Sequence, residues 1–63
     1  MIATLIVLIC TNASMDDCQA YAAQQWNDDH ARYECLASIE TVLDTLRREG
    51  LTNVGAYCEE SEE

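Results

Sequence analysis

Residues 1–10 read MIATLIVLIC, and this apolar stretch decides how the chain folds. It holds one hydroxyl side chain and no charge, glycine or proline, which is typical of a strand covered on both faces. In a strand its side chains alternate, with Ile2, Thr4, Ile6, Leu8 and Cys10 on one face and Ala3, Leu5, Val7 and Ile9 on the other. Two apolar faces need two covering layers, and the rest of so short a chain supplies about one. We therefore expect a partner, either a second copy or another protein, on the second face.

The chain has 63 residues, which is enough for one small domain spanning 1–63. Domains of this size bury only about 60% of the surface that their unfolded chain exposes. They usually need a disulfide, a metal or oligomerisation to be stable. An apolar fraction of 49% argues against a disordered chain.

Acidic residues dominate the charge: twelve face only three basic ones, Arg32, Arg47 and Arg48, for a net charge of −9. Phosphate backbones would repel such a chain, so we expect no direct binding to nucleic acid. Basic surfaces would attract it, including the DNA-binding clefts of other proteins. A simpler interpretation is that the charge keeps a small protein soluble.

The apolar start does not have the features of a targeting segment. A signal peptide begins with basic residues, and none of the first ten residues is charged. A membrane span needs about 20 apolar residues. A lipoprotein signal would place small residues before Cys10, where this chain has Leu8 and Ile9. We expect a structural strand and no membrane span.

Residues 18–26, CQAYAAQQW, are ambiguous and follow a loop at 11–17 that is rich in turn formers. Helical spacing puts Cys18, Tyr21 and Trp26 on one face, and Ala and Gln favour helix. Strand spacing gives only a weak two-faced pattern. Local propensity alone therefore predicts a helix here.

A helix is predicted near 28–49. Asp28 and Asp29 suit the start of the helix, the positive end of its dipole. Arg47, Arg48 and Gly50 suit its C-terminal end, where cations are favoured and a glycine can take a left-handed conformation. Its apolar stripe is predicted to consist of Leu36, Ile39, Leu43 and Leu46, flanked by Tyr33, Cys35 and Val42. A last strand near 53–59 and an acidic, frayed tail at 59–63 complete the chain.

The order of these segments resembles the YebW-like family of short, uncharacterised proteins from enterobacteria and their prophages. The matching residues are Cys10, Cys18-Gln19, Trp26, Cys35-Leu36 and Cys58. Two features depart from the family: the segment before the helix is longer, and Ala22-Ala23-Gln24-Gln25 replaces β-branched residues.

The resemblance implies that 18–26 is a strand. The fold is then α+β, a small antiparallel sheet in the order β-β-α-β with one helix packed on it and strands near 2–10, 18–26 and 53–59. The alternative is a strand followed by two helices. The resemblance also implies a phage or prophage accessory protein in the cytoplasm of a bacterial host.

Four cysteines, at 10, 18, 35 and 58, are the candidates for covalent chemistry. A zinc site usually has two close pairs of ligands, and here successive cysteines are 8, 17 and 23 positions apart. We expect free, packed thiols in a reducing cytosol, and no metal or other cofactor. Disulfides are the alternative, with Cys10–Cys58 and Cys18–Cys35 as the favoured pairs.

No catalytic constellation is apparent. His30 and Cys35 are five positions apart, so on a helix they point in different directions, and no glycine-rich oxyanion motif exists. We expect His30 to be solvated and the protein not to be an enzyme.

The predicted function is therefore binding, with inhibition or modulation of a host protein, and a DNA mimic is one form that this binding could take. The alternative is a disulfide-stapled structural protein of the cell envelope. The predicted partner-binding residues combine aromatic anchors with acids: Asp16, Asp17, Tyr21, Trp26, Asp28, Asp29 and Glu34. A DNA mimic would add the acids of the tail: Glu59, Glu60, Glu62 and Glu63.

Overall fold

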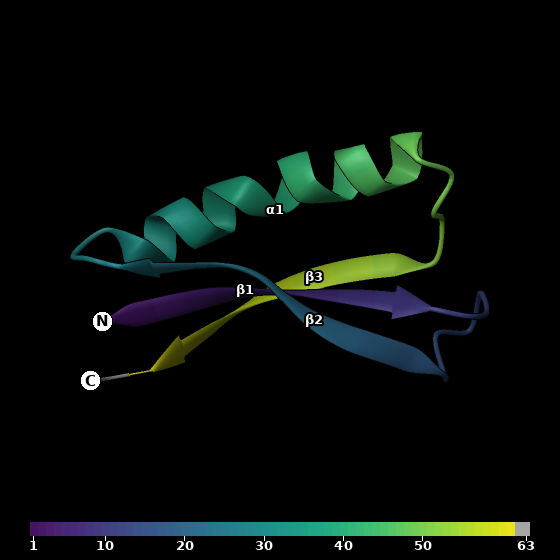
Figure 1. Ribbon diagram of the computed structural model, residues 1–63, viewed down its shortest axis with the longest axis horizontal. Coiled ribbons are helices and arrows are strands. Elements are labelled where there is room, and N and C mark those ends of the chain that lie inside the picture. The colour runs from purple at the N-terminus through teal and green to yellow at the C-terminus, as the bar shows by residue number, and fades with distance from the viewer. Residues whose placement is uncertain (62–63) are drawn as a thin grey trace.

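The computed structural model describes residues 1–61 and has an α+β fold. In chain order its elements are β1 (Ile2–Cys10), β2 (Cys18–Asn27), α1 (Ala31–Arg48) and β3 (Val54–Ser61). The strands form one antiparallel sheet in the order β2-β1-β3, and α1 lies along one side of it (Figure 1). The β-β-α-β prediction is confirmed, and the alternative with two helices is excluded.

β1 is the central strand, as its apolar sequence requires. Ala3, Leu5 and Val7 are buried on the side that faces α1, whereas the residues between them are half-buried. The predicted alternation of β1 is therefore confirmed. The core around it is small: among residues 1–61, only Leu5 and Cys35 are large, fully buried side chains.

β2 pairs with β1 through a β-bulge. Leu5 lies opposite Gln24, and the next residue, Ile6, lies opposite Ala22, so that Ala23 is the extra residue. A bulge of this kind changes which residues share a face on its two sides. The helix side therefore carries Gln19 and Tyr21 before the bulge and Gln24 and Trp26 after it.

β3 pairs with β1 from Val54 opposite Ile9 to Ser61 opposite Ile2. The predicted frayed tail is thus wrong for residues 59–61, because their backbone pairs with the first residues of β1. Glu60 also forms an ion pair with Arg32 of α1, with 3.1 Å between Oε1 and Nε. Positions 62 and 63 of the predicted tail lie outside the described residues.

α1 begins later than the sequence predicts, at Ala31, because β2 continues to Asn27 in its pairing with β1. The Asp28 carboxylate accepts a hydrogen bond from the His30 backbone N–H at 2.7 Å in the turn between them.

The helix end is a Schellman motif, in which a left-handed residue lets two backbone N–H groups bond back into the last turn. Gly50 has a φ of 96°. Its N–H donates to the Arg47 carbonyl, and the N–H of Leu51 donates to the Leu46 carbonyl, both at 3.0 Å. The predicted glycine stop is confirmed.

The face that the helix presents to the sheet overlaps the predicted one but is turned toward Cys35 and Val42, which the prediction placed at its flank. Ala31 and Cys35 are fully buried, and Ile39 and Val42 pack beside them. Leu36, which headed the predicted stripe, is 50% exposed, and Tyr33 is 76% exposed. The prediction was wrong by about one position, because the bond from Cys35 to the sheet sets the rotation of α1.

All four cysteines are paired, as Cys10–Cys18 and Cys35–Cys58. The expectation of free thiols and the favoured pairing are both wrong. Cys10 ends β1 and Cys18 begins β2 directly opposite it, so the hairpin itself brings this pair together. Cys58 lies opposite Leu5 on the helix side, where Cys35 meets it.

Candidate protein-binding face

The side of the sheet opposite α1 is the largest feature that the fold leaves without a layer of its own. No helix or strand within residues 1–61 packs on it (Figure 1). We call it the open face. The register of the three strands assigns it Ile2, Thr4, Ile6, Leu8, Ala20, Ala22, Gln25, Gly55, Tyr57 and Glu59.

The open face is apolar through its middle. One row across the sheet consists of Ala22, Ile6 and Tyr57. Leu8 continues the apolar surface in the next row, between an alanine of β2 and a glycine of β3. Tyr57 is 46% exposed even though it lies beside the central strand. An apolar surface with an exposed aromatic ring is suited to contact with another protein.

A polar row borders this apolar area. Gln25 of β2, Thr4 of β1 and Glu59 of β3 lie side by side in it. The Gln25 side chain donates a hydrogen bond to the Thr4 hydroxyl oxygen at 3.2 Å. This contact confirms that β2 after the bulge presents Gln25 to the open face.

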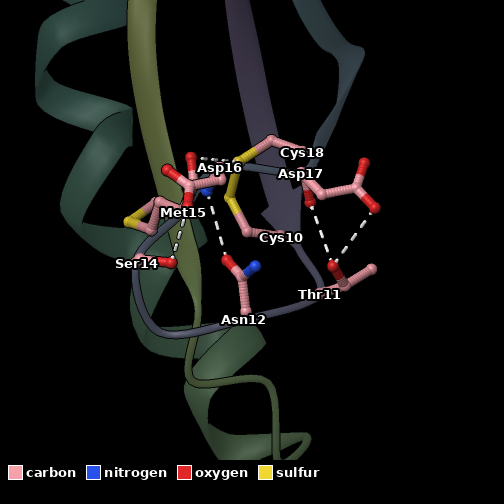
Figure 2. The surroundings of a disulfide bond; sticks show 8 residues. All are labelled: Cys10, Thr11, Asn12, Ser14, Met15, Asp16, Asp17 and Cys18. Atoms are coloured by element: carbon pink, nitrogen blue, oxygen red, sulfur yellow. Dashed lines mark hydrogen bonds between the residues drawn. A yellow bond between two sulfur atoms is a disulfide. The ribbon is translucent and has the colours of Figure 1, made fainter.

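The loop at 11–17, drawn in Figure 2, follows β1 directly and so lies at the end of the apolar area beyond Leu8. It is closed by the Cys10–Cys18 disulfide, and the Asn12 side chain accepts a hydrogen bond from the backbone N–H of Asp16 at 3.2 Å. Met15 has a φ of 58°, and its Cε lies 3.7 Å from where a Cβ on Gly55 would be. The Met15 side chain therefore extends the apolar surface of the open face beyond Leu8.

The predicted acidic residues fall into two groups at opposite ends of the molecule. Asp16 and Asp17 lie in the 11–17 loop at one end (Figure 2). Asp28, Asp29 and Glu34 lie at the start of α1, at the other end, which β3 reaches with Glu59 and Glu60. The longest dimension of the fold is 36 Å, so the two groups are well separated.

Glu34 is the carboxylate most affected by its surroundings. Burial, together with the nearby Asp28 carboxylate, raises the pKa of Glu34, and His30 opposes this effect. One of its oxygens, Oε2, is buried without a hydrogen-bond partner. The surroundings of Glu34 therefore disfavour the charged form of its carboxylate.

Neither predicted aromatic anchor lies on the open face. Trp26 is half-buried and packs against the core on the helix side. Tyr21 also points to the helix side, is 48% exposed, and donates a hydrogen bond to the side-chain oxygen of Gln19. The prediction of site residues left out Ile6, Leu8 and Tyr57, although the alternation of β1 already placed the first two on one face.

A catalytic pair, a metal site and a membrane-spanning helix are the other features that would indicate a function. Cys35 is fully buried in a disulfide, so it has no thiol to act with His30. Residues 1–61 contain no cluster of three or more side chains suited to hold a metal ion. Within the same range, no helix is long and apolar enough to cross a membrane. Comparison of the chain with protein families, with curated proteins and with solved structures gave no match.

Proposed function

We propose that this protein is a non-enzymatic binding protein that docks on a partner protein through the open face and thereby inhibits or modulates it. The observation that carries the proposal is the apolar area around Ile6, Leu8 and Tyr57, which no element of the fold covers. Contiguous apolar surface of this kind commonly marks an interaction site. The resemblance to prophage proteins makes a bacterial host protein the expected partner.

The net charge of −9 has a secondary part in this proposal. Charge on a binding protein mainly speeds its encounter with an oppositely charged partner, whereas apolar contact holds the complex. Asp16 and Asp17 lie at the opposite end of the molecule from the acids near Asp28. This separation favours steering by charge over a DNA mimic, which would need carboxylates spaced along one surface.

Two exposed tyrosines provide a matched test. Tyr57 lies on the open face, whereas Tyr33 lies on α1, on the other side of the molecule. Purified protein is used to capture partners from a host lysate in low and high salt. We expect the wild type and Tyr33→Ser to retain the same partner in high salt and Tyr57→Ser to lose it.

Two results would contradict the proposal. Undiminished capture by Tyr57→Ser would show that the open face is not the binding surface. Loss of the wild-type partner as salt rises would instead favour the DNA mimic, because attraction between exposed charges is screened by salt.

A second candidate function is that of a disulfide-stapled structural protein of the cell envelope. The observation in its favour is that Cys10–Cys18 and Cys35–Cys58 are both closed. Disulfides persist in oxidising compartments and are rare in the cytosol, so this candidate places the protein outside the cytoplasm. Protein isolated from its native host is alkylated without reductant and weighed by mass spectrometry. Four alkylated thiols would exclude the envelope candidate.

A further inference from the structure

We propose that two copies of this chain associate edge to edge through β2 and form a continuous six-stranded sheet. The strand order would be β3-β1-β2 in one copy, continued by β2-β1-β3 in the other. This inference goes beyond the proposed function, since it concerns an edge of the sheet and leaves the open face of each copy free for a partner.

The first argument is that β2 is an edge strand whose first half, before the bulge at Ala23, has no protecting feature. It pairs with β1 on one side only, so the backbone groups on its other side have no strand to bond to within residues 1–61. Proteins usually protect such edges with lysine, proline, other charges or very short strands. β2 is ten residues long, CQAYAAQQWN, and contains neither a charged residue nor a proline.

The opposite edge of the sheet carries charge in its last part. β3 carries Glu59 and Glu60, and Glu60 is already paired with Arg32 of α1. A second chain approaching this edge would meet acidic side chains. The two edges thus differ in charge, which is one of the features that prevents another strand from adding to an edge.

The second argument is charge, which limits the binding of a second copy to this strand edge and to nowhere else on the sheet. Each chain carries a net charge of −9, so most ways of bringing two copies together place like charges near each other. The open face itself includes Glu59. β2 is the one strand of the sheet that combines a free edge with ten uncharged residues, so two copies can meet there without repulsion between facing side chains.

The bulge limits where the two strands can pair. β2 is regular from Cys18 to Ala22, and the extra residue Ala23 follows. Bulges bend a strand and twist an edge away from further pairing. Antiparallel pairing about a two-fold axis over the regular half places Ala20 opposite the Ala20 of the other copy.

In this register Gln19 of one copy lies opposite Tyr21 of the other. The exposed Tyr21 ring then gains a neighbour across the strands, and cross-strand contacts of aromatic side chains stabilise sheets. Tyr21 and Gln19 lie on the helix side, so this contact does not use the open face.

The test uses the purified, oxidised full-length chain and three proteins: wild type, Ala20→Glu and Tyr57→Glu. Ala20→Glu places two carboxylates directly opposite each other at the two-fold axis, whereas Tyr57→Glu puts the same charge on the open face of β3. Sedimentation velocity over a range of concentrations measures self-association. We expect a concentration-dependent dimer for wild type and Tyr57→Glu, and a dimer weakened by about tenfold or more for Ala20→Glu.

Hydrogen exchange of the wild type gives a second measurement that does not depend on a variant folding. Amides within 18–22 that point away from β1 should exchange more slowly as concentration rises, while those of β3 do not change. A wild-type monomer up to about millimolar concentration would overturn the proposal, as would a dimer that Tyr57→Glu dissociates and Ala20→Glu does not. The proposed function is tested separately, by partner capture from lysate, so a failure of that test can be told apart from a failure of the dimer proposal.

Discussion

Cys35 of α1 and Cys58 of β3 are joined by a disulfide across the layer between helix and sheet, with their Cα atoms 6.1 Å apart. This bond sits inside the core, because Cys35 is fully buried next to Ala3, Leu5 and Ala31. Partly buried side chains such as Trp26 and Ile39 pack around this small cluster, and the disulfide adds a covalent link between helix and sheet.

Removing each disulfide should therefore have different effects. Closing a longer loop restricts the unfolded chain more, and the loops here span 23 and 8 positions. We expect Cys35→Ala/Cys58→Ala to lower the free energy of unfolding by about 3–4 kcal/mol, and Cys10→Ala/Cys18→Ala by about 2–3 kcal/mol. Urea unfolding followed by circular dichroism measures both. A larger loss for the Cys10–Cys18 pair would contradict this ranking.

The two glycines should respond in opposite ways to alanine. Gly50 has a φ of 96° and nothing within 4 Å of an added Cβ, so Gly50→Ala is opposed by backbone conformation alone. We expect it to destabilise the protein by about 1 kcal/mol. Gly55 lies within β3 and an added Cβ would make an ordinary contact with Met15. Gly55→Ala should be neutral or slightly stabilising. Thermal unfolding followed by circular dichroism measures both variants.

Two leucines test which side of α1 faces the sheet. Leu5 is fully buried at the centre of the core, whereas half of Leu36 is in solvent. Leu5→Ala should lower the free energy of unfolding by about 2–5 kcal/mol, because it leaves a cavity in a packed core. Leu36→Ala should lower the free energy of unfolding by well under half of that amount, because half of the side chain is already in solvent. Equal losses would indicate that Leu36 packs in the core, as its spacing in the sequence predicted.

Glu34 should make stability depend on pH. Its pKa is raised in the folded state by burial and by Asp28, so the folded protein binds more protons than the unfolded one just above pH 4.5. Stability should therefore fall as pH rises from 4.5 through the raised pKa of Glu34, and stay lower above it.

Glu34→Gln should remove this penalty and raise the melting temperature at pH 7, with little difference from wild type below pH 4.5. Glu40→Gln, a change at an exposed carboxylate of the same helix, is the control. A Glu34→Gln protein that is less stable than wild type at pH 7 would mean that the carboxylate makes a favourable contact.

The sequence contained enough to predict the parts of the fold that depend on local pattern. The alternation in β1 predicted its two faces, and Gly50 after two arginines predicted the end of the helix. The strand at 18–26 required the resemblance, because Ala and Gln favour helix locally and only pairing with β1 makes the segment extended.

Features set by long-range contact were not predictable. The cysteine pairing and the rotation of α1 depend on each other, since Cys35 faces the sheet only where Cys58 also points to the helix. The bulge at Ala23 has no marker such as glycine. For the same reason the sequence indicated an uncovered face through Ile6 and Leu8 but did not place Tyr57 on it.

The central position of β1 has a consequence for how the chain folds. β1 comes before both of its neighbours, and its two pairings differ greatly in sequence distance: Cys10 meets Cys18, whereas Ile2 meets Ser61. The β1–β2 hairpin can form as soon as its short loop closes, but the β3 side of this apolar strand stays open until Val54–Ser61 have been made. A nascent chain therefore passes through a stage in which Ile2–Cys10 is exposed along one edge. During synthesis this is the segment where a chaperone would protect the protein from aggregation.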